Sequence, residues 1–311
     1  MNTIALNALD SLNNPVDLSF VIVSFNTADL IGTCINSIYS IGDFNKEIFV
    51  VDNASNDGSA DFIRSEFPAA KVIANENNRG FAAANNQVFP FCRGRYIFLM
   101  NPDAEFIPAT FQYIISYMDS NPHIGLAGIK LINPDGSAQE SFSFEYPGQK
   151  YASRELAGLK GSIAWVLGAG MLIRSDLIRE LGGFDESFFV YGEDQDLCLR
   201  IRRAGYGIGY IDSATMVHLG GQSERQSRGP EVWRKKLLAE YVFYRKHYQP
   251  HTINRITRSY LMKSDWRIAS LRLFFPFYAD KNEAREKLLR YEIISAVIRR
   301  EILKKNEQNR S

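Results

Sequence analysis

Short apolar runs alternate with segments of helical periodicity over the first hundred residues of the chain. The run Ser19–Phe25 is continuous, short and rich in β-branched residues, which is typical of a strand buried on both faces. Three further runs of this kind follow, separated by segments whose apolar residues recur every three or four positions. This alternation predicts a mostly parallel, doubly wound α/β sheet. We expect the further strands at 47–51, 71–74 and 96–100, and the helices after Thr27 and at 59–67 and 81–91.

The pattern changes twice further along the chain. Strand-like runs at 125–132, 163–173 and 207–211 are mixed with two helical segments, and from Pro230 the periodicity is wholly helical. A polar stretch, QSERQSRG, precedes that change and marks the expected domain boundary. The predicted organisation is an N-terminal extension (1–17), an α/β domain (18–229) and a basic helical C-terminal region (230–311).

Charge is distributed unevenly between these regions. Residues 231–311 contain 19 Lys and Arg against 9 Asp and Glu, whereas the remainder contains 17 against 26. A basic tail behind an acidic domain indicates either an anionic surface as partner or a solvated helical face. Nucleic acid is disfavoured as a partner because the larger domain is acidic.

Three features narrow the class and location of the protein. The cysteines are few and widely spaced, which argues against a disulfide framework or zinc knuckle and suits a reducing compartment. The first eighteen residues lack the pattern of a signal peptide, and no apolar run is long enough to span a bilayer. We therefore expect a cytoplasmic protein.

Polar residues follow the predicted strands, where ligands of doubly wound sheets bind. Asp52 ends an apolar run and can accept hydrogen bonds from a nucleobase or ribose, or it can simply serve the turn. Arg79 and Gly80 precede a helix rich in alanine, where a phosphate would meet backbone N–H groups, or where small residues would pack tightly on the sheet. These positions are candidates for nucleotide binding.

A second set of candidates suits a divalent metal ion. Asp103 follows the fourth strand in the sequence Asn101-Pro102-Asp103, so a carboxylate is held just beyond a buried strand. An ordinary Pro-Asp turn would have the same sequence. His218, one of four histidines, precedes two glycines and is a further candidate ligand, although a single histidine often has a structural role.

Three acids, Glu193, Asp194 and Asp196, begin a predicted helix that ends in arginines. Acids at the start and bases at the end favour any helix. Three acids within four residues exceed that requirement, so we expect one of them to accept a proton from an attacking hydroxyl.

Seven segments in this order resemble the inverting glycosyltransferases of family 2, which have the GT-A fold. The resemblance covers about residues 18–222. The segments read SFVIVSFN, VVDNASNDGS, NRGFAAANN, FLMNPDAEF, WVLGAGMLIR, FDESFFVYGEDQDLCLRIRRAGY and VHLGG.

The resemblance implies a role for each matching residue. Asp194 corresponds to the catalytic base, supported by Glu193, while Asp103 and His218 would bind Mg²⁺ or Mn²⁺. Asn101 stands where the family's metal motif begins with an acid. The nucleotide would contact Asn26, Asp52, Asn53, Asn77, Arg79, Gly80 and Asn101, and the sugar and acceptor would contact Trp165, Gly168, Ala169 and Gly170.

The resemblance also implies the reaction. The NPD motif, with GAGM and GEDQDLCLR, most resembles the rhamnosyltransferase-like branch that uses dTDP-L-rhamnose, with a glycan or lipid-linked acceptor of a bacterial surface polysaccharide. Galactofuranosyl- or other hexosyltransferases using UDP-sugars are the alternative, as is a non-catalytic partner that binds nucleotide sugars. A nucleotidyltransferase is disfavoured because the segment after the first strand, SFNT, lacks the glycine and lysine of a phosphate loop.

Aromatic and basic residues are interleaved in the C-terminal region, as in Lys263–Tyr278. Such a segment suits peripheral contact with an anionic membrane at its cytoplasmic face, where lipid-linked acceptors reside. The alternatives are helices that pack on the core of the protein or that form a homodimer.

Overall fold

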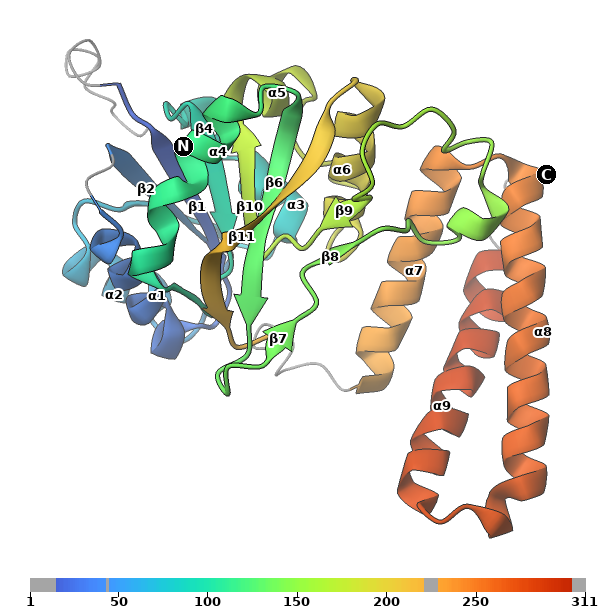
Figure 1. Cartoon of the computed structure of the whole chain (residues 1–311). Helices are drawn as coiled ribbons and strands as arrows, with labels where there is room; N and C mark the ends of the chain where they lie inside the picture. The colour runs from blue at the N-terminus through green and yellow to red at the C-terminus, as the bar shows by residue number, and fades with distance from the viewer. Residues whose placement is uncertain (1–14, 43–44, 221–228, 304–311) are drawn as a thin grey trace. The chain divides into compact units, whose positions relative to one another are not determined.

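The computed structural model describes residues 15–42, 45–220 and 229–303 (Figure 1). The predicted N-terminal extension lies outside these ranges except for 15–17, as does nearly all of the polar stretch at the predicted domain boundary, so the predicted domain limits stay predictions. The described residues form two compact units. The first comprises 15–144, 160–189 and 194–220, and the second comprises 145–159, 190–193 and 229–303.

The first unit contains one sheet of nine strands among the described residues, in the order β3-β2-β1-β4-β10-β6-β11-β5 with β7 paired to β6. Strands β1 to β4 run parallel, as do β6 and β11, whereas β5, β7 and β10 are antiparallel to their neighbours. The prediction of a mostly parallel sheet is therefore confirmed. The strands are β1 (Leu18–Ser24), β2 (Lys46–Asp52), β3 (Lys71–Ala74), β4 (Tyr96–Met100), β5 (Ala104–Phe106), β6 (Ile124–Ile132), β7 (Ala138–Gln139), β10 (Gly170–Arg174) and β11 (Gly207–His218), with β8 (Phe142–Ser143) and β9 (Trp165–Val166) forming a separate pair.

Helices cover both faces of this sheet, since successive residues of a strand point to opposite faces. Phe20 and Ile22 of β1 join the core that contains Ile35 of α1, whereas Val21 joins the core that contains Ala82 of α3. The sheet is therefore doubly wound. The helices of this part are α1 (Ala28–Ser40), α2 (Ser59–Glu66), α3 (Phe81–Asn86), α4 (Ile114–Ser120), α5 (Ser175–Glu180) and α6 (Glu193–Arg203).

Two predicted elements are interrupted. The strand expected over 163–173 is split into β9, which pairs with β8, and β10, which lies in the main sheet. The loop between them bonds to other segments: the N–H of Leu167 donates to the carbonyl of Ser141, and the carbonyl of Ala169 accepts from the N–H of Asn101. The helix expected over 81–91 ends at Asn86 and is followed by a 3₁₀ turn, Phe89–Phe91. Pro90 within that turn has no N–H to continue an α-helix.

The second unit is helical, as predicted from Pro230 onward. It consists mainly of α7 (Gly229–His247), α8 (Pro250–Phe274) and α9 (Lys281–Val297), with a 3₁₀ turn, η6 (Phe275–Phe277), between the last two and a π-helical end at Ile298–Leu303 (Figure 1). Its core contains Tyr241, Phe243 and Tyr244, and the ring of Tyr146 stacks on that of Phe243 with centroids 5.8 Å apart. Within the described residues, no helix has the length and apolar character needed to cross a membrane.

Candidate active site

The ends of three neighbouring parallel strands bring the first candidate residues to one edge of the sheet. Ser24 of β1 pairs with Asp52 of β2, and Ile22 of β1 pairs with Met100 of β4. The residues that follow these strands therefore emerge at the same edge, where a ligand of a doubly wound sheet binds.

Asp52 is buried, and its two carboxylate oxygens differ in their partners. Its Oδ2 accepts a hydrogen bond from the backbone N–H of Ser55 at 3.1 Å, which closes the turn after β2. Its Oδ1 is buried and has no hydrogen-bond partner among the residues that the structure describes. Because an unpaired buried acceptor is unfavourable, this oxygen is suited to accept from a ligand N–H or hydroxyl. Asn26, at φ 52°, braces the same turn through a bond from the Asn56 N–H to its Oδ1 at 2.8 Å.

Asn53 organises the loop that carries Arg79. Its Oδ1 accepts from Asn75 Nδ2 at 3.1 Å and from the backbone N–H of Arg79 at 3.0 Å, while its Nδ2 donates to Asn78 Oδ1 at 2.9 Å. Asn77 and Arg79 themselves are exposed. Asn53 therefore acts on the predicted nucleotide region by holding this loop, and Arg79 is left accessible.

Gly80 is required by packing. Its φ is 80°, and a Cβ atom at this position would lie 2.4 Å from the carbonyl oxygen of Phe189. The backbone N–H of Phe81 donates to that same oxygen at 2.8 Å. Packing against Phe189 is therefore one reason for the glycine, and the predicted approach of a phosphate to this backbone stays a prediction.

Asp103 and His218 meet where β5 pairs with β11. His218 Nε2 lies 3.4 Å from Asp103 Oδ1 and 3.3 Å from Asn101 Nδ2, and both Asp103 and His218 are buried. The pairing of His218 with Ala104 in the β-ladder fixes this arrangement. The structure thus brings three residues of the predicted diphosphate and metal region together.

Gln139 of β7 determines which nitrogen of His218 carries the proton. Its Oε1 lies 2.7 Å from His218 Nδ1, and an amide oxygen can only accept a hydrogen bond. Nδ1 therefore carries a proton, and Nε2 lies near both Asn101 Nδ2 and Asp103 Oδ1. Asp103 Oδ1 is buried and, among the described residues, has no hydrogen-bond partner.

A carboxylate beside an imidazole nitrogen suits a cation. Metal-binding histidines commonly donate their other ring N–H to an oxygen acceptor, as His218 does to Gln139. The described residues contain no group of three or more His, Cys, Asp and Glu side chains that could hold a metal ion. A divalent ion here would have two protein ligands, Asp103 and His218, and would need further oxygen ligands, such as those of a diphosphate.

Asp194 lies in the first turn of α6, where its carboxyl group is buried. Burial raises its pKa to about 6, although backbone N–H groups of Gln195, Gly168 and Asp194 itself oppose the shift by hydrogen bonding. The sequence predicts that one acid of this helix start accepts a proton. The structure adds that burial dominates, so the group changes its protonation near neutral pH, as suits a general base.

Asp196, two residues later, has a structural role. Its fully buried carboxylate accepts from Arg200 Nε at 2.7 Å. Arg200 also donates to the carbonyl groups of Leu181 and Gly183, which fixes α6 to the turn after α5. Of the three acids at this helix start, Asp196 is therefore already paired.

The loop between β9 and β10 contacts both Asn101 and Asp194. The carbonyl of Ala169 accepts from the backbone N–H of Asn101 at 3.4 Å, and Gly168 lies against Phe81 and Asp194. A Cβ on Gly168 would be 4.0 Å from the Cβ of Asp194. Trp165 lies on β9. Gly170 begins β10, and a Cβ atom at this position would lie against the side chain of Ile129.

Glu193 is also buried, but it belongs to the second unit, so its predicted support of Asp194 stays a prediction. Sequence reasoning missed Gln139, Asn75 and Ser55. These residues act through hydrogen bonds to His218, Asn53 and Asn26, and no local sequence pattern marks them.

Comparison with known proteins identifies the family of this chain. Residues 19–182, more than half of the chain, match the family described as Glycosyl transferase family 2. An N-acetylglucosaminyl-diphospho-decaprenol L-rhamnosyltransferase of Mycobacterium tuberculosis is 24% identical over 55% of this chain and 66% of its own length. The Rhamnosyltransferase WbbL of Escherichia coli is 31% identical over 30% of this chain and 36% of its own length. The matches thus cover less than two thirds of these relatives.

Solved structures share the fold across most of the chain. The mannosyltransferase PcManGT of Pyrobaculum calidifontis, in complex with GDP-Man and Mn²⁺, has a TM-score of 0.58 at 18% identity and covers 92% of this chain and 89% of its own. The first 349 residues of S. aureus TarS with UDP-GlcNAc give 0.54 at 17% identity, covering 91% and 92%. These similarities confirm the predicted GT-A fold, and with the family match they show that the chain belongs to glycosyl transferase family 2.

Proposed function

We propose that this protein transfers a sugar from a nucleotide-sugar donor to a hydroxyl group of a glycan or lipid-linked acceptor, with inversion at the anomeric carbon, in polysaccharide biosynthesis. The observation that carries the proposal is the buried Asp194 carboxylate, whose pKa of about 6 suits a base and whose neighbouring loop bonds to Asn101. Membership of family 2 supports the same reaction class.

Asp194 accepts the proton of the acceptor hydroxyl as its oxygen attacks the anomeric carbon. A new glycosidic C–O bond forms on one face while the C–O bond to the nucleoside diphosphate breaks on the other. The backbone N–H groups around Asp194 hold the carboxylate in place before it receives the proton. Burial keeps bulk water away from this base.

The residues at the strand ends bind the donor. The unpaired Oδ1 of Asp52 accepts a hydrogen bond from the nucleoside, and the exposed Arg79 attracts the diphosphate. Asp103 and His218 would hold Mg²⁺ or Mn²⁺, which when bound neutralises the charge of the departing diphosphate. The Mn²⁺ present in the PcManGT complex supports this assignment.

We further propose dTDP-L-rhamnose as the donor. Two rhamnosyltransferases are among the relatives, and the NPD sequence containing Asp103 resembles that of the rhamnosyltransferase-like branch. A UDP-hexose is the alternative, because the solved relative TarS was crystallised with UDP-GlcNAc.

A panel of nucleotide sugars tests these proposals in two stages. The melting temperature of the protein is measured with each sugar in the presence of Mn²⁺, since a ligand that binds the folded state raises it. Release of nucleoside diphosphate is then measured with and without lipid-linked acceptors. We expect dTDP-L-rhamnose to give the largest increase and the fastest release.

A larger response to a UDP-sugar would replace the donor assignment and leave the reaction class intact. Stabilisation by a nucleotide sugar without release under any acceptor condition would favour a non-catalytic binding partner. Absence of both responses across the panel would overturn the proposed function.

A further inference from the structure

One face of α8 carries side chains that the second unit leaves uncovered. Its members are separated by three, four or seven residues or are direct neighbours, so they lie on one side of the helix and continue into η6. We call this set the α8 stripe. It consists of Arg255, Arg258, Ser259, Met262, Lys263, Trp266, Leu273, Phe274 and Phe277, all of them exposed except Ser259, which is half-buried.

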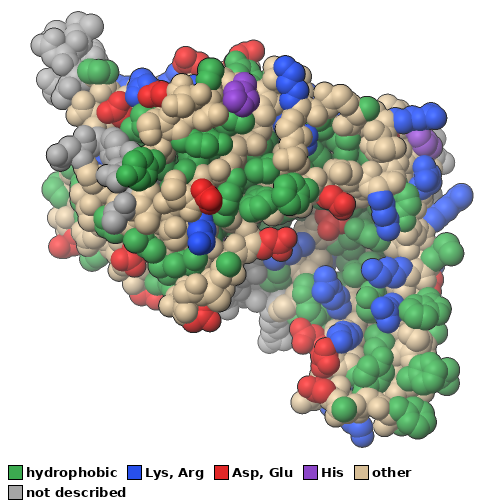
Figure 2. Space-filling view, viewed as in Figure 1, with side chains coloured by type: hydrophobic (Ala, Val, Ile, Leu, Met, Phe, Trp, Pro, Cys, Tyr) green, Lys and Arg blue, Asp and Glu red, His purple; other side chains and the backbone are tan. Residues whose placement is uncertain are grey.

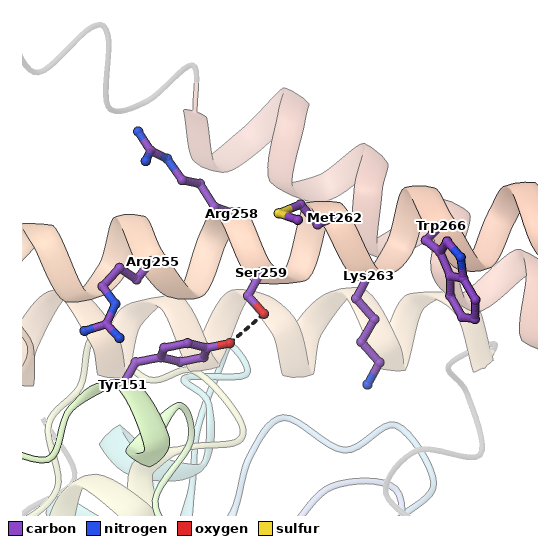
Figure 3. A pocket seen from close by; sticks show the side chains of 7 residues that line it. All are labelled: Tyr151, Arg255, Arg258, Ser259, Met262, Lys263 and Trp266. Carbon is purple, nitrogen blue, oxygen red and sulfur yellow. Dashed lines mark hydrogen bonds between the residues drawn. The ribbon is translucent and has the colours of Figure 1, made fainter.

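The first half of the α8 stripe is cationic. Arg255, Arg258 and Lys263, with Tyr151, Met262 and other members, line an open groove of about 510 Å³ (Figure 3). The Tyr151 hydroxyl donates to Ser259 Oγ at 2.6 Å, and the Arg255 guanidinium lies 5.5 Å from the Tyr151 ring centroid. These contacts hold the Tyr151 side chain in place in the lining of the groove.

The cations of this half are available to an external anion. Among the described residues, no carboxylate pairs with Arg258 or Lys263. Asp265, the one acid of α8, points its carboxylate to Arg299 at 2.7 Å. The groove thus presents positive charge without internal neutralisation.

The second half of the α8 stripe is apolar and solvent-exposed. The exposed fractions are 83% for Phe277, 69% for Leu273, 63% for Trp266 and 53% for Phe274. Figure 2 shows hydrophobic side chains gathered at this end of the helical hairpin, with Lys and Arg side chains nearby. A cluster of apolar side chains with exposed fractions this large indicates a surface that binds a partner.

The cations of the first half and the apolar side chains of the second half together indicate which partner the α8 stripe binds. A small anion would neutralise the groove and leave Leu273, Phe274 and Phe277 in water. A second copy docked through the same stripe would bring like charges together, which is unfavourable. An anionic bilayer satisfies both halves, because its phosphates attract cations and its acyl chains accept apolar side chains.

We propose that the α8 stripe docks this protein on an anionic lipid bilayer. Leu273, Phe274 and Phe277 insert between the lipids, while Arg258 and Lys263 contact headgroup phosphates. The proposal extends the membrane contact expected for the C-terminal region by naming the surface that makes it. It does not depend on the proposed sugar transfer.

Vesicle flotation of the full chain tests this proposal. The vesicles are of phosphatidylcholine alone, or of equal parts phosphatidylcholine and phosphatidylglycerol. We expect binding to the anionic vesicles that weakens with salt, and little binding to the neutral ones. The charge variant Arg258→Gln/Lys263→Gln and the apolar variant Leu273→Ser/Phe274→Ser/Phe277→Ser should each bind at least about tenfold more weakly.

Matched controls come from the first unit. Arg64→Gln/Lys130→Gln removes two exposed cations, and Tyr113→Ser removes an exposed aromatic ring. Both should bind as the unaltered chain does. Circular dichroism checks the folding of every variant, and the charge variant, which alters only exposed side chains, keeps the test valid if the apolar variant unfolds.

Three results would overturn the proposal: no binding to anionic vesicles, equal binding to both vesicle types, or undiminished binding of folded variants. Light scattering after gel filtration addresses the alternative occupant. If the chain is dimeric and the stripe variants become monomeric without any vesicle binding by the original chain, the surface is an interface between copies.

Discussion

The two units of this protein depart from the usual distribution of side chains in opposite ways. In the first, carboxylates that would favour water are buried at strand ends and at a helix start, as with Asp52, Asp103 and Asp194. In the second, apolar side chains that would favour the core are exposed along α8, as with Trp266 and Phe277. Each exception is local and clustered, and such clusters are where binding surfaces are found.

The two buried aspartates of α6 differ in their partners. Asp194 and Asp196 are both buried, and within the part of the chain that the structure describes Asp196 has an ion pair, to Arg200, and Asp194 has none. Burial alone therefore does not identify a functional acid. The contrast between these two carboxylates and the contact of Gln139 with His218 lead to four predictions, given in order of expected effect.

Asp194→Asn should lower turnover about 10³-fold, because removal of a general base typically costs that much. The affinity for the donor nucleotide should stay within about twofold, since Asn has the same shape. Single-turnover kinetics and calorimetric titration measure the two quantities. Asp61→Asn, at an exposed position of α2, is the control and should be fully active. Retention of most activity by Asp194→Asn would exclude it as the base.

Asp196→Asn should destabilise the fold by about 3 kcal/mol, because Arg200 would lose its charged partner within a largely buried network. Urea denaturation gives the free energy of unfolding. Arg200→Leu should cause a loss of similar size, and the double variant should lose less than the sum of the two. Unfolding at unchanged urea concentration would contradict the structural role given to Asp196.

Asp194→Asn should, by contrast, stabilise the fold at neutral pH. The carboxyl group of Asp194 has an ordinary pKa of 3.8, which burial raises to about 6 in the folded chain. Between these values the folded state binds more protons than the unfolded state, so this group lowers stability as pH rises. The gain for Asn should be on the order of 3 kcal/mol above pH ~7 and vanish below pH ~4.

Thermal unfolding across this pH range measures the difference between the two chains. A pH-independent difference would show that Asp194 does not titrate in the window. The turnover of the unaltered chain should fall as pH decreases through about 6, where the base becomes protonated.

Gln139→Ala should weaken Mn²⁺ binding about tenfold, because His218 would lose the acceptor that fixes its proton on Nδ1. Titration of Mn²⁺ in the presence of the donor nucleotide measures the affinity. Gln139→Glu retains an oxygen acceptor and should bind Mn²⁺ at least as well as the unaltered chain. Equal affinity for Gln139→Ala would remove Gln139 from the site.

Much of the sheet could be predicted because the ends of its apolar runs coincide with the ends of its strands. The strands expected at 71–74 and 96–100 have the observed bounds. The prediction of one continuous strand over 163–173 was wrong, because the residues between β9 and β10 bond to Asn101 and Ser141. A run of apolar residues does not reveal such long-range partners.

The site was predictable only in part, for a related reason. Asp52, Asp103 and Asp194 stand out as acids next to apolar runs, so the sequence marks them. Gln139 lies 79 residues from His218, and only the pairing of β7 with β6 brings them together. The difference between Asp194 and Asp196 likewise depends on where Arg200 points.

The contact between Gly80 and Phe189 has a consequence for how this protein could diversify. The Phe189 carbonyl oxygen receives the N–H of Phe81 and leaves no room for a side chain on Gly80. The backbone of the loop bearing Arg79 is therefore in direct contact with the backbone at Phe189. Mutations that move this loop would have to move Phe189 as well, so new donor preferences should arise through substitutions that leave this contact intact.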